Sequence, residues 1–303
     1  MKTTKAGEKD VTAAKRSRRP PIGRAILYFV AILAAFYSFW PLMVMALEGY
    51  DIDLSVIFAG KAVRYIFNIP FYSGGIFPTP IHYLDALTFG GFPRLVENSL
   101  IIAFISIAIA LVVGIPIAYI LARVEIKGRN IVAYLLLAMR TVSPFAIIIP
   151  LYITYSRLGI YDTYSGISLA EDTLILSVVV WMIRGFFADI PKEIYDAASV
   201  FGKSEGQIFR RVILPMVIPG IVITALFALV LIWNEFLFAV TLTGATTKTV
   251  AVGVWTGIGE GSTRSVEWDT LNAAGTLAFI PAVAVMLAIR KYLAKGFSLG
   301  AAH

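Results

Sequence analysis

Six stretches of this chain are long and apolar enough to cross a lipid bilayer as helices, and this feature restricts the fold more than any other. A helix needs about 20 mostly apolar residues to cross the hydrocarbon layer. The 303-residue sequence is 58% hydrophobic and 15% charged, whereas a soluble domain is about 45–50% apolar and about 25% charged. We therefore predict an all-α membrane protein with six transmembrane helices, at residues 25–47, 98–122, 131–155, 166–187, 219–242 and 271–289.

The distribution of Lys and Arg predicts the orientation of these helices. Basic residues gather before the first segment, between the second and third, between the fourth and fifth, and after the sixth. Because cytoplasmic loops carry an excess of Lys and Arg, both termini and the connection between segments four and five are predicted to be cytoplasmic. Residues 1–24 then form a basic cytoplasmic tail, residues 25–303 form the transmembrane domain, and residues 48–97 form a long external loop. The net charge of +7 is explained by this asymmetry, without a nucleic-acid partner.

A few ionisable residues fall within the apolar segments. Arg140 lies in the third, and Glu235 is the one acid clearly inside a segment, next to Trp233 and Asn234. A charged group at the bilayer centre costs about 2.5–3.5 kcal/mol on insertion scales, so it usually faces a helix bundle or a watery cavity. Three interpretations stay open for these four residues: contact with a polar substrate, structural pairing between helices or subunits, and gating.

A polar insert at residues 190–215 interrupts the apolar segments and is predicted to form two short amphipathic helices. The first has an apolar stripe at helical spacing, formed by Ile194, Ala197, Ala198 and Phe201. Gly202 can end this helix, Ser204 and Gln207 fit a capping box for the next, and Pro215 is predicted to stop the second. Taken alone, such an insert could also be a helix that rests on the bilayer surface.

The spacing within this insert resembles the coupling motif of importer-type ABC transporter permeases. That pattern is Glu-Ala-Ala, three residues, Gly, nine residues, then Ile-x-Leu-Pro. This chain has Asp196-Ala197-Ala198, three residues, Gly202, nine residues, then Val212-Ile213-Leu214-Pro215. It departs from the pattern by Asp at 196 and Val at 212. Asn98-Ser99-Leu100, Ile190-Pro191-Lys192-Glu193 and Trp233-Asn234-Glu235-Phe236 resemble the carbohydrate branch, and the likeness covers about residues 95–295.

The resemblance implies a permease subunit in the cell membrane that forms half of a path for a sugar. It implies three kinds of protein partner besides membrane lipid: a second homologous permease, two ATP-binding subunits and an extracytoplasmic sugar-binding protein. It also implies which residues contact the ATP-binding subunit: Glu193, Asp196, Ala197, Ala198, Gly202, Lys203, Leu214 and Pro215. ATP and Mg would be bound by the partner subunits, so this chain is expected to hold no cofactor and to be no enzyme.

Three other functions are alternatives to that of a permease subunit. An ion-coupled secondary carrier for a small polar solute would use intramembrane acids and often an inverted repeat. An intramembrane enzyme would need paired Asp, Ser with His, or metal-ligating His inside the spans, and the chain has no Cys and only two His. A structural scaffold gives no reason for the coupling-motif spacing. A phosphate-binding Gly-x-x-x-x-Gly-Lys-Ser/Thr loop is absent from the sequence, as a permease served by separate ATP-binding subunits requires.

Overall fold

The computed structural model describes residues 21–50, 80–88, 91–257 and 268–300. The chain divides into two compact units, Met1–Val44 and Met45–His303. The described part of the first unit is helix α1 (Pro21–Glu48), whose last residues enter the second unit. Residues 1–20 of the predicted tail and 51–79 of the predicted external loop lie outside the described residues.

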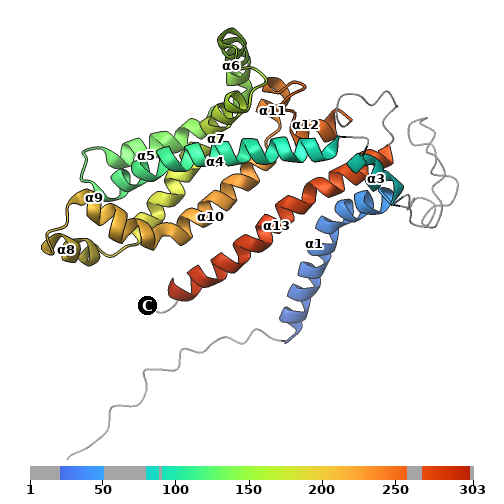
Figure 1. Cartoon of the computed structure of the whole chain (residues 1–303). Coiled ribbons are helices and arrows are strands. Elements are labelled where there is room, and N and C mark those ends of the chain that lie inside the picture. The colour runs from blue at the N-terminus through green and yellow to red at the C-terminus, as the bar shows by residue number, and fades with distance from the viewer. Residues whose placement is uncertain (1–20, 51–79, 89–90, 258–267, 301–303) are drawn as a thin grey trace, which may run out of the picture. The chain divides into compact units, whose positions relative to one another are not determined.

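The described part of the second unit is helical throughout (Figure 1). Its elements are α3 (Ile81–Thr88), α4 (Phe92–Arg123), α5 (Arg129–Ala138), the 3₁₀ turn η2 (Met139–Thr141), α6 (Pro144–Leu158), α7 (Tyr164–Ala188), α8 (Lys192–Val200), α9 (Glu205–Ile208), the π turn η3 (Phe209–Ile213), α10 (Leu214–Trp233), α11 (Leu237–Leu242), α12 (Val250–Trp255) and α13 (Trp268–Gly300). Over the described residues of the whole chain, five helices are long and apolar enough to cross a membrane, or six if one bent pair counts as a span. The all-α membrane fold is thus confirmed.

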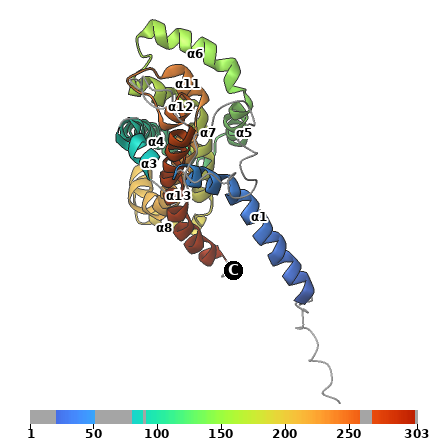
Figure 2. The same cartoon turned by 90° about the vertical axis from the view of Figure 1, so that its right-hand side faces the viewer.

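The third predicted span is a bent pair of helices, not one continuous helix. α5 with η2 meets α6 at an angle of 85°, and the change of direction is visible in Figure 2. Pro144 disfavours helical backbone in the residue before it, and both Val142 and Ser143 are extended. Arg140, predicted within this span, lies in η2 at the break with an exposed side chain.

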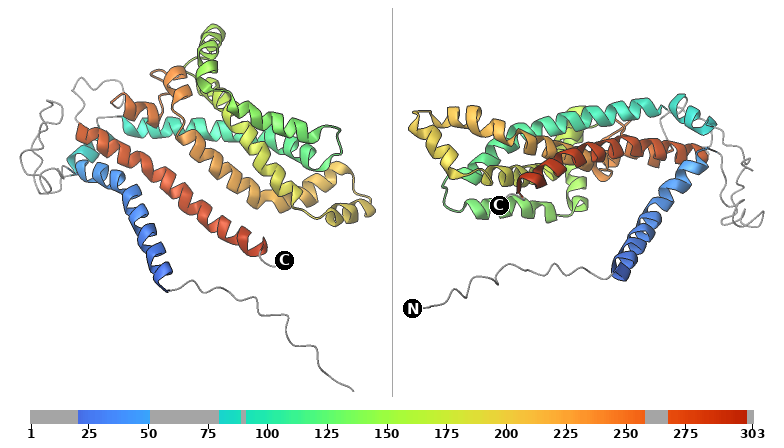
Figure 3. Two further views of the ribbon diagram at one scale, coloured as in Figure 1. Left: turned by 180° about the vertical axis from the view of Figure 1, so that it is seen from behind. Right: turned by 90° about the horizontal axis from the view of Figure 1, so that it is seen from below.

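Helices α4 and α7 form the centre of the second unit and run parallel to each other (Figures 1 and 3). The Ser168 hydroxyl donates to the main-chain oxygen of Ile102, and further along both helices Arg123 donates to that of Phe187. Small residues bring the two backbones close, and this buried stripe on α4 consists of Ala103, Ser106, Ala110, Gly114 and Ala118. A Cβ at Gly114 would lie 3.0 Å from a methyl carbon of Val179.

The fifth span begins and ends earlier in the sequence than the predicted range of 219–242. The helical run that can cross a membrane extends over Glu205–Trp233, and the chain leaves the helix at Asn234 before the short helix α11 begins. Gly220 lets α10 approach α7, because a Cβ there would meet the ring of Phe186 at 2.4 Å. The Trp233 indole N–H donates to the main-chain oxygen of Ala278 at 3.0 Å, which ties α10 to α13.

Candidate functional site

Helix α8 stands at one end of the second unit, at the opposite end from α11 and α12 (Figures 1 and 3). Ala198 is buried and Ile194 is half-buried against the core, whereas Ala197 is exposed. Phe201 is 83% exposed, so the predicted apolar stripe does not continue to this residue. The reason is that α8 ends at Val200 and Phe201 has left helical geometry, with φ −75° and ψ 12°.

The acidic and small residues of the predicted coupling motif point outward from α8. The side chains of Glu193 and Asp196 are exposed, as is that of Ala197. Val200, at the end of the helix, is 86% exposed. This arrangement leaves α8 free to contact a partner along its outer face.

Gly202 ends α8 as predicted, with a left-handed φ of +73°. Its N–H donates to the oxygen of Ser199 at 2.9 Å, and a residue without a Cβ adopts this conformation at low cost. The predicted capping box is confirmed, since the Ser204 N–H donates to Oε1 of Gln207 at 3.2 Å. Lys203, between these residues, is half-buried.

Pro215 does not stop the helix that begins at Glu205, contrary to the prediction. The backbone passes from α9 through the π turn η3 into α10, and Pro215 lies in the first turn of α10. In the π turn the backbone hydrogen bonds join residues five apart, so the bonding pattern before Pro215 differs from that of an α-helix. A proline in the first turn of a helix costs no hydrogen bond, because an N–H there has no partner within the helix. Leu214, half-buried, precedes the exposed Pro215, and the motif's last two residues lie in a continuous helical run from α9 through η3 into α10.

Arg123, at the end of α4, joins that helix to the turn before α8. Its guanidinium donates to the main-chain oxygens of Phe187, at 2.6 Å, and of Ile190. Carbonyls at a helix C-terminus lack partners within the helix, and a basic side chain there satisfies them. A cavity of about 700 Å³ opens beside this contact, between α8 and the end of α4, and Glu193, Asp196 and Glu205 are among its lining residues.

The inner face of α8 contacts the following helix through one polar pair. The Tyr195 hydroxyl donates to Oε1 of Glu205 at 2.5 Å, the short distance expected when the acceptor is a carboxylate. This hydrogen bond, with a smaller effect of burial, raises the pKa of Tyr195 above its ordinary value. The hydroxyl therefore keeps its proton and stays a donor.

The four candidates for the substrate path fall into two groups. Glu235 accepts the N–H groups of Phe238 and Ala239, each at 3.0 Å, and thereby caps α11, while Trp233 bonds to α13 as described above. Asn234 and Arg140 have exposed side chains. Glu235 and Trp233 therefore make hydrogen bonds within the chain, whereas Arg140 lies in η2, outside the segment 233–235.

Two buried acids in α7 were not recognised from the sequence. Both acids lie near the start of the predicted span at 166–187, but their burial was not predicted: in α7 Glu171 is only 2% exposed and Asp172 only 7%. Glu171 accepts the Ser106 hydroxyl of α4 at 3.2 Å and interacts electrostatically with Glu235. The oxygens of Asp172 are buried without a hydrogen-bond partner in the described part of the chain. The prediction that Glu235 is the one acid inside a span is wrong.

At the end opposite α8, Asp162 holds the segment between α11 and α12. Its carboxylate accepts the N–H groups of Gly244, Thr246 and Thr247 and the hydroxyl of Thr247, at 2.7–3.1 Å. Burial alone would raise the pKa of Asp162, but these four hydrogen bonds outweigh it and lower the pKa below its ordinary value. Asp162 has a φ of +52°, a conformation that Asp tolerates better than most residues.

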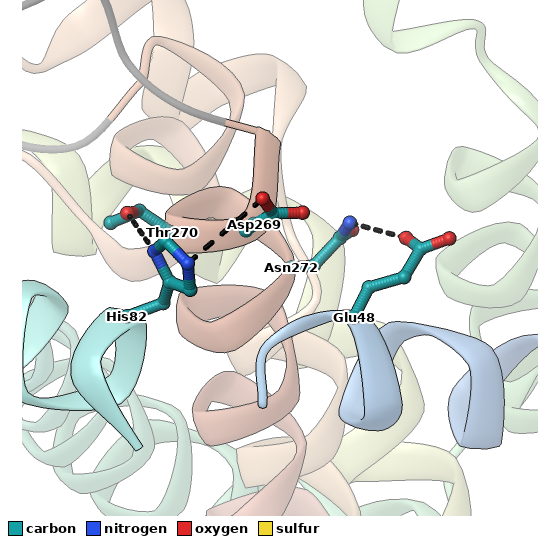
Figure 4. A network of polar contacts seen from close by, with 5 residues as sticks. All are labelled: Glu48, His82, Asp269, Thr270 and Asn272. Carbon is teal, nitrogen blue, oxygen red and sulfur yellow. Dashed lines mark hydrogen bonds and ion pairs between the residues drawn. The ribbon is translucent and has the colours of Figure 1, made fainter. Parts of the chain in front are cut away.

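A second polar group at this end joins α3, the end of α1 and the start of α13 (Figure 4). The His82 ring lies between Thr270, with Nδ1 and Oγ1 3.3 Å apart, and Asp269, with Nε2 and Oδ2 3.9 Å apart. Asn272 donates to Glu48 at 2.6 Å. No group of three or more His, Cys, Asp or Glu placed to hold a metal ion occurs among the described residues.

Comparison with known proteins decides the family. Residues 114–299, more than half of the chain, match the family described as binding-protein-dependent transport system inner membrane component. The chain belongs to this family. It is therefore a transport permease, as the coupling-motif spacing predicted, and not an enzyme.

Individual relatives of this permease cover most of its length. The trehalose transport system permease protein SugB of Mycobacterium tuberculosis is 31% identical over 208 residues, 67% of this chain and 74% of that protein. The trehalose/maltose transport system permease protein MalG of Thermococcus litoralis is 26% identical over 285 residues, 94% and 98% of the two chains. A crystal structure of a bacterial ABC transporter involved in alginate import has a chain of the same fold, with a TM-score of 0.69 at 19% identity, covering 91% of this chain and 98% of that one.

Proposed function

We propose that this permease forms one half of the translocation path of an ATP-driven sugar importer in the cell membrane. The named relatives transport trehalose or maltose, and a structure with the same fold is an alginate transporter in complex with its oligosaccharide-bound periplasmic protein. These likenesses support a sugar as the substrate class. The complete importer would contain a second permease, two ATP-binding subunits and an extracytoplasmic sugar-binding protein.

The observation that carries this proposal is the exposed helix α8, which has the Asp-Ala-Ala and Gly spacing and is joined by the Gly202 turn to the continuous helical run of α9, η3 and α10. Asp196 and Glu193 would pair with basic groups of an ATP-binding subunit, and the small exposed side chain of Ala197 would allow close approach, whereas Ala198 packs inward against the core of this chain. Gly202 adopts the left-handed conformation of the turn between α8 and α9 without steric cost. With α8 in the cytoplasm, as the Lys and Arg pattern predicts, both termini would also be cytoplasmic.

ATP hydrolysis would belong to the partner subunits, which would bind both ATP and Mg. The permease would contribute the moving helices. A displacement of α8 would pass to α4 through Arg123, and through the Gly202 turn to α9, which continues into α10. Large exposed apolar side chains on α5 and α6, among them Tyr134, Leu135, Phe145 and Ile149, would face lipid or the second permease.

Within the substrate path, Asn234 and Arg140 are the better candidates for sugar contact. Their side chains are exposed, although the Asn234 amide also donates to the main-chain oxygen of Val230 at 2.8 Å. Glu235 and Trp233 are only partly exposed and bond within the chain. Hydroxyl groups of a sugar suit an amide and a guanidinium as hydrogen-bond partners.

Uptake into proteoliposomes distinguishes this function from an ion-coupled carrier. The complete complex is reconstituted with its binding protein, and the sugar carried by that binding protein is identified by mass spectrometry and used as the substrate. We expect uptake that requires ATP and is insensitive to collapse of ion gradients. Uptake by this chain alone, driven by a proton or sodium gradient without ATP, would contradict the proposal.

A further inference from the structure

The Gly202 turn, residues 200–204, is the place where α8 could flex without moving α10. A Cβ built at Gly202 meets no atom within 4 Å, so no neighbouring side chain supports the turn at this point. Val200 and Phe201 are also exposed. The geometry of the turn therefore depends on hydrogen bonds more than on packing.

One bond between side chains crosses this turn in the described residues. Tyr195 lies on α8 and Glu205 is the first residue of α9, and their side chains meet at 2.5 Å. The other bonds near the turn are local: Gly202 to Ser199 within one side of it, and Ser204 to Gln207 within the other. Tyr195 is thus the residue that fixes α8 against the helix that follows.

We infer that Tyr195 and Glu205 are positioning residues that make α8, α9 and α10 move as one body. This inference rests on the proposed function, because it assigns how the motion of α8 reaches the membrane helices. Arg123 holds the other side of α8, through the oxygen of Ile190. When an ATP-binding subunit moves α8, the Tyr195–Glu205 hydrogen bond prevents the Gly202 turn from absorbing the displacement.

The inference predicts uncoupling when the bond is removed. A hydrogen bond to a charged group shifts a conformational equilibrium by roughly tenfold or more. The measured quantity is the stimulation ratio: ATP hydrolysis by the complete reconstituted importer with sugar-loaded binding protein, divided by hydrolysis without it. We expect Tyr195→Phe to lower this ratio about fivefold or more, because the signal between the two membrane faces must pass through α8.

Variants of the acceptor make the test specific. Glu205→Ala should lower the ratio as Tyr195→Phe does. The double variant should be no worse than Tyr195→Phe alone, since that variant already lacks the bond to Glu205 together with the interaction of the hydroxyl with Tyr119 of α4. Glu205→Gln keeps an acceptor oxygen and should retain most of the ratio. Tyr83→Phe is the matched control: it removes a hydroxyl bond, to the oxygen of Ala46, at the opposite end from α8, and should leave the ratio unchanged.

Assembly and melting temperature are measured on the same samples, so that loss of folding is distinguished from loss of coupling. A wild-type ratio in an assembled Tyr195→Phe importer would overturn the inference and leave the proposed function intact. A fully additive double variant would overturn it as well. A wild-type complex without ATP-dependent uptake would instead contradict the proposed function itself.

Discussion

Oδ1 of Asp162 lies 2.7 Å from the main-chain nitrogen of Gly244, which follows it by 82 residues. The same carboxylate accepts the N–H groups of Thr246 and Thr247, so one side chain accepts three main-chain N–H groups of the segment between α11 and α12. Gly244 is needed for this approach, because a Cβ there would lie 2.7 Å from Oδ2 of Asp162. The end of the bundle opposite α8 is thus held by a short polar contact between residues distant in sequence.

Replacing Asp162 should loosen this end of the molecule. Asp162→Ala removes all four hydrogen bonds and leaves their donors to water, for a loss of about 2–3 kcal/mol of stability, given about 1.5–3 kcal/mol for a bond to a charged acceptor and incomplete additivity. Asp162→Asn keeps an acceptor oxygen and tolerates the positive φ, so it should lose less. Thermal unfolding in detergent measures both, and equal melting temperatures for Asp162→Ala and wild type would contradict this role.

The lowered pKa of Asp162 also predicts a dependence of stability on pH. Because the pKa in the folded protein is below that in the unfolded chain, the carboxylate contributes its full stabilisation above the ordinary Asp value of about 3.9. That stabilisation is lost as the pH falls through the lowered pKa. Melting temperature measured from about pH 7 down to about pH 3 should fall less steeply in Asp162→Asn than in wild type. Parallel curves would show that Asp162 does not titrate in this way.

Substitution of Gly202 should act through the backbone, because a new side chain there has room. The left-handed conformation costs about 1–2 kcal/mol for an ordinary residue and less for Asn. Gly202→Val should therefore weaken assembly with the ATP-binding subunit more than Gly202→Asn does. Co-purification yield and binding-protein-stimulated ATP hydrolysis check this order. If Asn and Val proved equally harmful, contact with the partner, and not the turn, would set the requirement.

Glu235 should matter for the shape of α11 more than for contact with the substrate. Glu235→Gln keeps an oxygen able to accept a main-chain N–H and should preserve both folding and transport. Glu235→Ala removes the cap at a cost of about 1 kcal/mol and should lower the melting temperature. Transport that fails in Glu235→Gln while the protein remains folded would instead place this carboxylate in the substrate path.

The features that the sequence could predict are those encoded locally. Runs of apolar residues predicted the helices that span the membrane, and the conformation of Gly202 followed from its place at the end of a short amphipathic helix. The capping box of Ser204 and Gln207 was also predictable, because its two members lie three residues apart. The family likewise followed from local spacing within residues 190–215.

The features that the sequence could not predict depend on contacts between distant elements. The Arg123 contact with Ile190 and the Asp162 contact with Gly244 require the paths of the intervening helices. Pro215 was expected to stop a helix, and only the π turn ahead of it explains why the helix continues. The burial of Glu171 was missed because it depends on the packing of α7 against α4, and its partner Ser106 has no distinguishing local signal.

The central claim is that α8 contacts an ATP-binding subunit in the cytoplasm, and single-cysteine cross-linking tests it most directly. The natural sequence has no cysteine, so Val200→Cys on α8 and Trp255→Cys on α12, both exposed positions, each provide one thiol. We predict that Val200→Cys cross-links to the ATP-binding subunit with a yield that changes on ATP addition, while only Trp255→Cys reacts with a membrane-impermeant maleimide applied outside intact cells. Labelling of Val200→Cys from outside, or the absence of its cross-link in an assembled complex, would contradict the account.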